Sequence, residues 1–171
     1  MKQLAIAFTG PSNSGKTTLI EKISKELTKN FTIAVIKHDP SNKAIFDVKG
    51  KDSYKFFNSG ANVAVVSDVR TTIFKHETSN LNRLIEHLKP FDLLLVEGLK
   101  NWDLPRIGIF RGNIEESYLP YLQAVAIDNT ISKEQKDNLS VDILDLNNID
   151  EIIKYIWKNA KFVGDWYGKY I

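Results

Sequence analysis

"AFTGPSNSGKTTLIEKI", residues 7–23, begins in an apolar run, passes through two glycines and a lysine, and ends in an amphipathic pattern. Residues 10–17 match the phosphate-binding pattern G-x-x-x-x-G-K-[ST] at every defined position. The apolar run predicts a strand that enters the motif, and the 3.6-residue period predicts a helix that leaves it. This context is the one that the motif requires. The stretch therefore predicts a loop that cradles nucleotide phosphates.

Each residue type in this loop has a chemical purpose. Glycines let backbone N–H groups point inward around an anion, where a Cβ would obstruct the fold of the loop. We expect Lys16 to reach the β- and γ-phosphates and the Thr17 hydroxyl to coordinate Mg²⁺. The positive N-terminal end of the helix favours the same negative charge. The predicted phosphate-binding residues are Gly10, Ser12, Asn13, Ser14, Gly15, Lys16, Thr17 and Thr18. For Thr18 the pattern fits a cap of the first helical turn equally well.

A second carboxylate is expected at the end of a neighbouring strand, where it orders Mg²⁺ and its waters. The run "DLLLVEG" supplies Glu97 and Gly98 at its carboxyl end, where open α/β sheets bind ligands. Asp92 would lie about 16 Å away at the other end, by the rise of a strand. We expect Lys16 and Glu97 to be catalytic, Thr17 and Glu97 to hold the metal, and Gly98 to leave room for the γ-phosphate. The alternative for Glu97 is a surface charge after a strand.

Polar residues also follow the second apolar run. Lys37, His38 and Asp39 end "VIKHDP" at the same predicted edge of the sheet. They could contact the nucleotide, a metal or an acceptor substrate, or they could form a solvated turn ahead of Pro40. The sequence alone does not distinguish between these interpretations.

A third polar segment, "KGKDSYK", precedes a short predicted helix. Asp52 or Ser53 could cap this helix, and Lys49 and Lys51 could serve an anion at its N-terminus. A capped helix with solvated lysines explains the pattern nearly as well. Arg106 and Arg111 flank another apolar run, and arginine suits bidentate phosphate contacts, although most arginines are surface charges.

The chain as a whole alternates apolar runs with segments of helical period. This alternation predicts an α/β fold of the P-loop NTPase type: a mostly parallel sheet with helices on both faces, in three layers. Helices are expected after the glycine motif, over residues 81–88 and from residue 149, and a long polar loop with a short helix over residues 40–61. The predicted strands are residues 4–9, 32–38, 62–68, 92–98, 107–110, 124–128 and 141–146.

Composition limits the class of protein. The 171 residues are 43% hydrophobic and contain no cysteine, which suits one domain spanning residues 1–171 and excludes thiolate chemistry. The net charge of +2 is too balanced to predict nucleic-acid binding. No apolar run approaches the roughly 18 residues of a membrane span, and we expect a cytoplasmic protein. The aromatic tail, residues 160–171, is expected to pack back on the domain, with a partner-binding strip as the alternative.

Several of these motifs occur together and in order. G-P-S-N-S-G-K-T-T, I-K-H-D, G-K-D-S-Y-K, L-V-E-G-L-K and P-R-I resemble the MobB family of molybdopterin-guanine dinucleotide biosynthesis proteins. The resemblance runs from about residue 3 to residue 130. Many family members carry Arg where Tyr54-Lys55 continues the G-K-D-S motif, and Lys cannot reproduce the bidentate fork of Arg.

The resemblance implies a GTP-binding homodimer with weak, Mg²⁺-dependent GTPase activity. It also implies an adaptor role beside the nucleotidyltransferase MobA, which joins GMP to molybdopterin. By matching position, Lys37, His38, Asp39 and Glu97 would line the γ-phosphate side. Residues 51–53 would be candidates for a second anionic ligand such as the pterin phosphate. The motifs themselves contain no guanine reader, because the only K-x-D is residues 37–39, away from the late position that this signature occupies.

Three functions remain open at this point. The first is the adaptor with slow GTP hydrolysis, which we favour. The second is a P-loop small-molecule or nucleoside kinase, against which the scarcity of arginines counts, since such kinases close an arginine-bearing lid over the phosphate. The third is a module that binds nucleotide without turnover.

Overall fold

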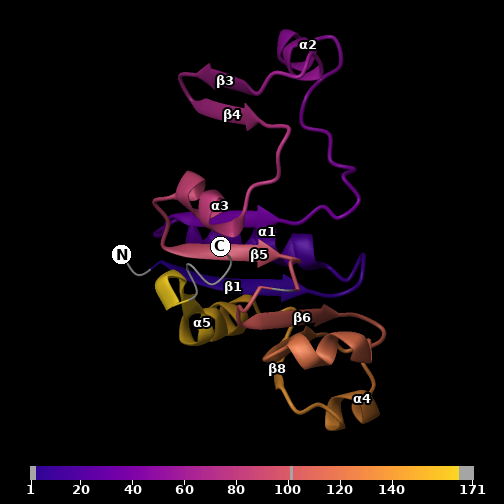
Figure 1. Ribbon diagram of the computed structural model, residues 1–171. Coiled ribbons are helices and arrows are strands. Elements are labelled where there is room, and N and C mark those ends of the chain that lie inside the picture. The colour runs from indigo at the N-terminus through magenta and orange to yellow at the C-terminus, as the bar shows by residue number, and fades with distance from the viewer. Residues whose placement is uncertain (1–2, 101, 166–171) are drawn as a thin grey trace. The chain divides into compact units, whose positions relative to one another are not determined.

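The computed structural model describes residues 3–100 and 102–165, and its chain divides into two compact units (Figure 1). Of the described residues, the sheet unit comprises 3–38, 88–100 and 102–165. The hairpin unit is Asp39–His87. The single domain stays a prediction, and each unit is described by itself.

A parallel sheet forms the centre of the sheet unit. Its strands run in the order β2-β5-β1-β6-β7-β8, and all neighbouring pairs in this series are parallel. The short β9 pairs antiparallel with Leu4 and Ala5 of β1, and β6 then takes over the same side of β1 from Ala7. The strands are β1 (Leu4–Thr9), β2 (Ile33–Lys37), β5 (Leu93–Glu97), β6 (Arg106–Phe110), β7 (Ala124–Ile127), β8 (Asp142–Asp145) and β9 (Lys161–Phe162).

Helices α1 (Lys16–Leu27) and α5 (Ile149–Asn159) cover one face of this sheet. Their apolar stripes, with Ile23 and Ile156 fully buried, pack on every second residue of the strands, such as Ile6 and Phe8. Burial of a large apolar side chain contributes about 1.5–3 kcal/mol, so this shared stripe stabilises the unit.

The alternate strand residues form a second cluster on the opposite face. Val125 and Ile127 of β7 pack there with Phe110 and Leu122, and the side chain of Tyr118 lies against them. Tyr118 belongs to the 3₁₀ helix η1 (Glu116–Tyr121), and α4 (Lys133–Asp137) and η2 (Val163–Asp165) complete the unit. The predicted fold, a mostly parallel sheet with helices, is confirmed.

The hairpin unit contains α2 (Asp52–Asn58), β3 (Val63–Ser67) and β4 (Arg70–Phe74), and α3 (Leu81–Leu88) follows. Here one prediction was wrong: the predicted strand over residues 62–68 does not join the parallel sheet. It pairs antiparallel with β4, which we did not predict, in a two-stranded sheet of its own. The Ser67 hydroxyl explains the tight reversal, because it accepts hydrogen bonds from the N–H groups of Val69 and Arg70 at 3.4 and 3.2 Å.

Within residues 3–100 and 102–165, no helix has the length and apolar character needed to cross a bilayer. The C-terminal tail was expected to pack back on the domain, and its first part, β9, pairs with β1. The tail aromatics Trp166, Tyr167 and Tyr170 lie outside the described residues.

Candidate functional site

The loop between β1 and α1 has the backbone that the glycine pattern predicts. Gly10, Asn13 and Gly15 have positive φ angles of 143°, 63° and 98°. A Cβ on Gly10 would lie 2.3 Å from the carbonyl oxygen of Ile109, so no other residue fits there. The loop therefore turns back tightly over β6 before the helix begins.

The N-terminus of α1 is left open by its own sequence. Its N-cap is Gly15, without a side-chain acceptor, and its first turn contains no acidic residue. Helices α4 and α5 of the unit differ, since Ser132 caps α4 and Asn148 caps α5 through side-chain oxygens. Within the described residues, no side chain therefore caps the first N–H groups of α1, and an external anion can pair with them.

Lys16 lies at the centre of the loop. Its ammonium group donates to the carbonyl oxygens of Gly10 and Pro11 at 3.0 and 2.6 Å and contacts the Ser14 hydroxyl at 3.5 Å. Partial burial lowers the pKa of Lys16, and the nearby Glu97 carboxylate opposes this shift. The charge is thus held above the loop among oxygen atoms, where a phosphate would meet it.

Glu97 ends β5 beside the loop, and it joins two of the other predicted residues. The Thr17 hydroxyl donates to Glu97 Oε2 at 3.4 Å. The ammonium of Lys37, at the end of β2, lies 3.2 and 3.3 Å from the two carboxylate oxygens. The carboxyl ends of β1, β5 and β2 therefore bring Lys16, Thr17, Lys37 and Glu97 to one place.

The backbone after Glu97 bends sharply. Gly98 and Leu99 have φ angles of 91° and 48°, and a Cβ on Gly98 would lie 3.0 Å from His38 Cβ. Arg106 holds this bend, because its guanidinium donates to the carbonyl oxygens of Gly98, Leu99 and Trp102 at 2.7, 2.9 and 3.1 Å. Arg106 is 1% exposed, so it is neither a phosphate ligand nor a surface charge, and both sequence interpretations of it were wrong.

Arg111 follows β6 and lies against the phosphate loop. A Cβ on Gly15 would be 3.4 Å from Arg111 Nε. Its Nη1 donates to Asp128 Oδ2 at 2.6 Å. Asp128, just after β7, is buried and also accepts from the N–H and hydroxyl of Thr130. These hydrogen bonds and the Arg111 charge lower the pKa of Asp128.

Sequence reasoning did not select Asp128. The available signal was its position directly after a buried strand, the same signal that selected Glu97.

A cavity of about 310 Å³ opens over the start of α1. Its lining residues are Asn13, Gly15, Lys16, Thr17 and Thr18.

Ser12 and His38 are exposed side chains of the same unit, whereas Ser14 is buried and accepts from Lys16. Among the described residues, no group of three or more His, Asp or Glu side chains could hold a metal by itself. Mg²⁺ commonly takes one or two protein ligands and completes its shell with phosphates and water, which the Thr17–Glu97 pair would fit.

The remaining predicted residues belong to the hairpin unit. Asp39 Oδ2 accepts from the N–H of Ala44 at 2.7 Å. Asp52 pairs with Lys55 at 3.1 Å, and the Ser53 hydroxyl donates to Asp47 at 3.0 Å.

The expected side-chain cap on α2 was wrong. The N-cap is Lys51, whose side chain makes no capping hydrogen bond. The anion-binding role of residues 51–53 stays a prediction.

Comparisons with known proteins identify the family of the chain. A family model described as "MobB: Molybdopterin guanine dinucleotide synthesis protein B" matches residues 5–132. A Haemophilus influenzae protein, "Molybdopterin-guanine dinucleotide biosynthesis adapter protein", is 31% identical over 161 residues, covering 88% of this chain and 86% of that protein. A relative from Methanocaldococcus jannaschii is 32% identical over 162 residues; they cover 91% of this chain and 61% of that longer protein.

The fold is similar to that of solved structures. The crystal structure of Bacillus subtilis MobB has a TM-score of 0.71 and 24% identity, covering 92% of this chain and 98% of that one. On the family match, the chain belongs to the MobB family of molybdopterin-guanine dinucleotide biosynthesis adapter proteins.

Proposed function

We propose that the protein is a GTP-binding adaptor with slow, Mg²⁺-dependent GTPase activity, which acts in the cytoplasm beside a MobA-like nucleotidyltransferase. The observation that supports this most is the meeting of Lys16, Thr17, Lys37 and Glu97 at an uncapped helix N-terminus. The names of the relatives supply the pathway, the joining of a guanine nucleotide to molybdopterin.

In this proposal the chain's own groups hold the triphosphate. The open N–H groups of α1 and the Lys16 ammonium bind the β- and γ-phosphates, and Lys16 exchanges its carbonyl contacts for phosphate oxygens. Thr17 and Glu97 would hold Mg²⁺, which supplies positive charge against the phosphate oxygens. Glu97 also orients the attacking water, and Lys37 keeps the Glu97 carboxylate in position.

Slow turnover is consistent with the arginines of the sheet unit. The buried guanidinium of Arg106 is occupied by three carbonyl oxygens, and that of Arg111 is paired with Asp128. P-loop GTP hydrolysis without a supplied arginine can be as slow as about 10⁻⁴ s⁻¹. Such a rate suits a protein that carries a nucleotide to a partner better than one that phosphorylates a metabolite.

A homodimer is part of the proposal, and the hairpin unit supports it. Val66, Val69 and Ile73 of the hairpin and Phe56 of α2 are 71%, 94%, 54% and 58% exposed. Apolar groups at this density on a small sheet are typical of surfaces that a partner covers. A second copy of the chain is the occupant we propose.

Phosphate release from GTP with Mg²⁺ tests the catalytic part. Glu97→Gln should keep GTP binding and lower the hydrolysis rate about 10²-fold, as expected for loss of a general base or water-orienting group. Glu21→Gln, an exposed change on α1, is the matched control and should hydrolyse GTP like the wild type. Wild-type turnover in Glu97→Gln would remove Glu97 from the mechanism.

The same preparation distinguishes the adaptor from the kinase. An adaptor passes the γ-phosphate only to water, and its addition raises the rate at which a MobA-like enzyme forms the guanine dinucleotide. Transfer of the γ-phosphate to a nucleoside or other acceptor hydroxyl would favour the kinase and contradict the proposal.

A further inference from the structure

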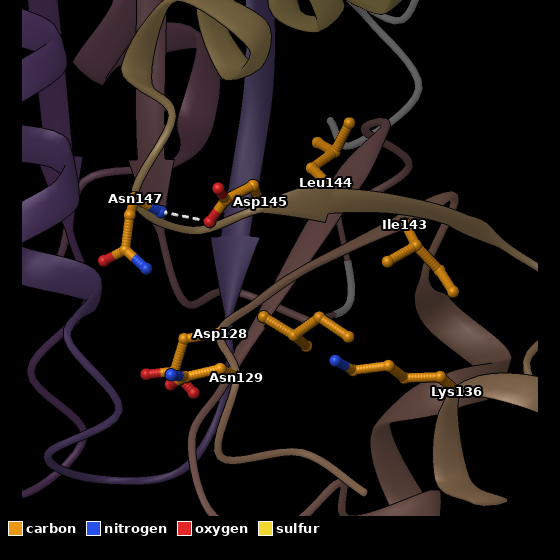
Figure 2. A pocket seen from close by; sticks show the side chains of 8 residues that line it. Asp128, Asn129, Lys136, Ile143, Leu144, Asp145 and Asn147 are labelled. Atoms are coloured by element: carbon orange, nitrogen blue, oxygen red, sulfur yellow. Dashed lines mark hydrogen bonds between the residues drawn. The ribbon is translucent and has the colours of Figure 1, made fainter. Parts of the chain in front are cut away.

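A second cavity opens at the carboxyl ends of β7 and β8, away from Glu97 (Figure 2). Its volume is about 360 Å³. Figure 2 shows the Lys136 side chain reaching from α4 toward the other lining residues, with Asp145 and Asn147 placed at the end of β8. The lining combines the apolar Ile143 with charged and amide groups, the mixture that small-molecule pockets commonly have.

This cavity lies on the same sheet edge as the phosphate loop. Only β6 separates β1 from β7, so the carboxyl ends of β1 and β7 are about 10 Å apart. Arg111 bridges the interval, because it lies against Gly15 and pairs with Asp128, which lines the cavity. On the other side of β1, Glu97 and Lys37 occupy the strand ends. A nucleotide with its phosphates on the loop would therefore extend its base toward β7 and β8.

The backbone around Asp145 is fixed in advance. Its N–H donates to Glu151 Oε2 at 3.1 Å, and its Oδ1 accepts from the N–H of Asn147 at 2.8 Å. Asn148 then caps α5 by accepting from the N–H of Glu151 at 3.1 Å. The carboxylate is thus held at the rim of the cavity without depending on a ligand.

Several polar groups of the cavity retain hydrogen-bonding capacity. In the part of the chain that the structure describes, no hydrogen bond engages Asp145 Oδ2 or the side-chain amides of Asn129 and Asn147. Asp128 differs, since Arg111 and Thr130 already use both of its oxygens. Asp128 is therefore part of the wall, whereas Asp145, the two amides and the Lys136 ammonium can recognise a ligand.

We propose that this cavity binds the nucleobase of the nucleotide held by the phosphate loop, and that Asp145 selects guanine. The inference rests on the proposed function and adds the base-reading residues to it. The Watson–Crick edge of guanine presents two adjacent donors, N1–H and the 2-amino group, which a carboxylate accepts together. Adenine presents an acceptor at N1, which would face the carboxylate unfavourably.

The rest of the lining fits this assignment. An amide N–H of Asn129 or Asn147, or the Lys136 ammonium, can donate to guanine O6. Ile143 and the alkyl stem of Lys136 offer apolar contact to the faces of the ring.

The test measures dissociation constants for GTP, xanthosine triphosphate and inorganic tripolyphosphate. Asp145→Asn keeps the Oδ1 acceptor for Asn147 but replaces one carboxylate oxygen by an amide donor. It should weaken GTP binding about 10- to 100-fold, the worth of a hydrogen bond to a charged group. It should also shift preference toward xanthine, which has a carbonyl in place of the 2-amino group, and leave tripolyphosphate binding unchanged. Asp137→Asn, an exposed change on α4, is the control for charge and should bind like the wild type.

A second variant tests the same cavity if Asp145→Asn does not fold. Ile143→Trp, at a side chain that is 45% exposed, would fill the cavity and should weaken GTP but not tripolyphosphate. The base assignment alone would be overturned if GTP binding requires Lys16 but folded Asp145→Asn binds GTP as tightly as the wild type. In that case the ratio of its affinities for GTP and xanthosine triphosphate would also be unchanged. A wild-type chain that binds no GTP would overturn the proposed function and this inference together.

Discussion

In the sheet unit Phe8 and Ile23 are completely buried, whereas Val66 and Val69 of the hairpin unit are 71% and 94% exposed. Both units are rich in β-branched and aromatic residues, and the sheet unit packs them between its sheet and its helices. The β3–β4 hairpin and α2 contain no buried residue at all among their described positions. A two-stranded sheet is marginally stable by itself, so its apolar surface needs cover.

This contrast separates two tasks. The sheet unit builds a rigid edge on which Lys16, Thr17 and Glu97 meet, because parallel strands align their carboxyl ends. The hairpin unit presents surface instead. We infer that the first unit holds the nucleotide and that the second makes contact with another chain.

Paired truncations give the largest expected difference between the units. Phe8→Ala should lower the free energy of unfolding by about 3–5 kcal/mol, because it empties space in the core. Phe56→Ala, at a side chain that is 58% exposed, should change it by less than about 0.5 kcal/mol when the protein is dilute. Urea unfolding followed by circular dichroism measures both. Equal losses would mean that the two units are equally packed.

Self-association should be sensitive to substitutions in the hairpin unit and not to those in the sheet unit. Val66→Glu puts a charge on the exposed hairpin and should weaken dimerisation about tenfold or more, since a desolvated carboxylate has no partner there. Tyr121→Glu, an exposed change in the sheet unit, is the control. Sedimentation equilibrium measures the dimer constant. A wild-type constant in Val66→Glu would exclude this face of the hairpin from the dimer contact.

The smallest expected effect concerns pH and lies at the Asp128 carboxylate, which accepts hydrogen bonds from Thr130 and Arg111. Because the pKa of Asp128 is lowered in the folded chain, its stabilisation is present above the unfolded pKa of about 3.9 and is lost as the pH falls through the folded value. Asp128→Asn should therefore be about 1 kcal/mol less stable at pH 7, with the gap narrowing below about pH 4. Unfolding curves at pH 3 and pH 7 test this. A gap that stays constant with pH would contradict the assignment.

Much of the fold was predictable because the signals were local. The glycine pattern, the buried runs and the 3.6-residue periods each report on a few adjacent residues, and β1, α1, β5 and β7 agree with them within a residue or so. The hairpin was not predictable in the same way. The apolar run over residues 63–67 predicts a buried strand. The sequence does not show whether the same chain covers such a run.

The residues of the candidate site also differ in whether local sequence signals identify them. Lys16, Thr17 and Glu97 could be chosen because motif and strand end identify them. The burial of Arg106 and the pairing of Arg111 with Asp128 depend on contacts between segments that are far apart in sequence, such as Arg106 with Gly98. Arginine at the end of an apolar run gives no sign of whether it will face a phosphate or three carbonyl oxygens.

Calorimetric titration of Mg²⁺–GTP into the wild type and Lys16→Ala tests the central claim most directly, with Lys22→Ala on the exposed side of α1 as the matched control. The account predicts saturable binding to the wild type and to Lys22→Ala. It predicts an affinity at least about 100-fold weaker for Lys16→Ala, as expected when one partner of a charge pair is truncated. Equal affinity in Lys16→Ala, with the fold intact, would contradict it.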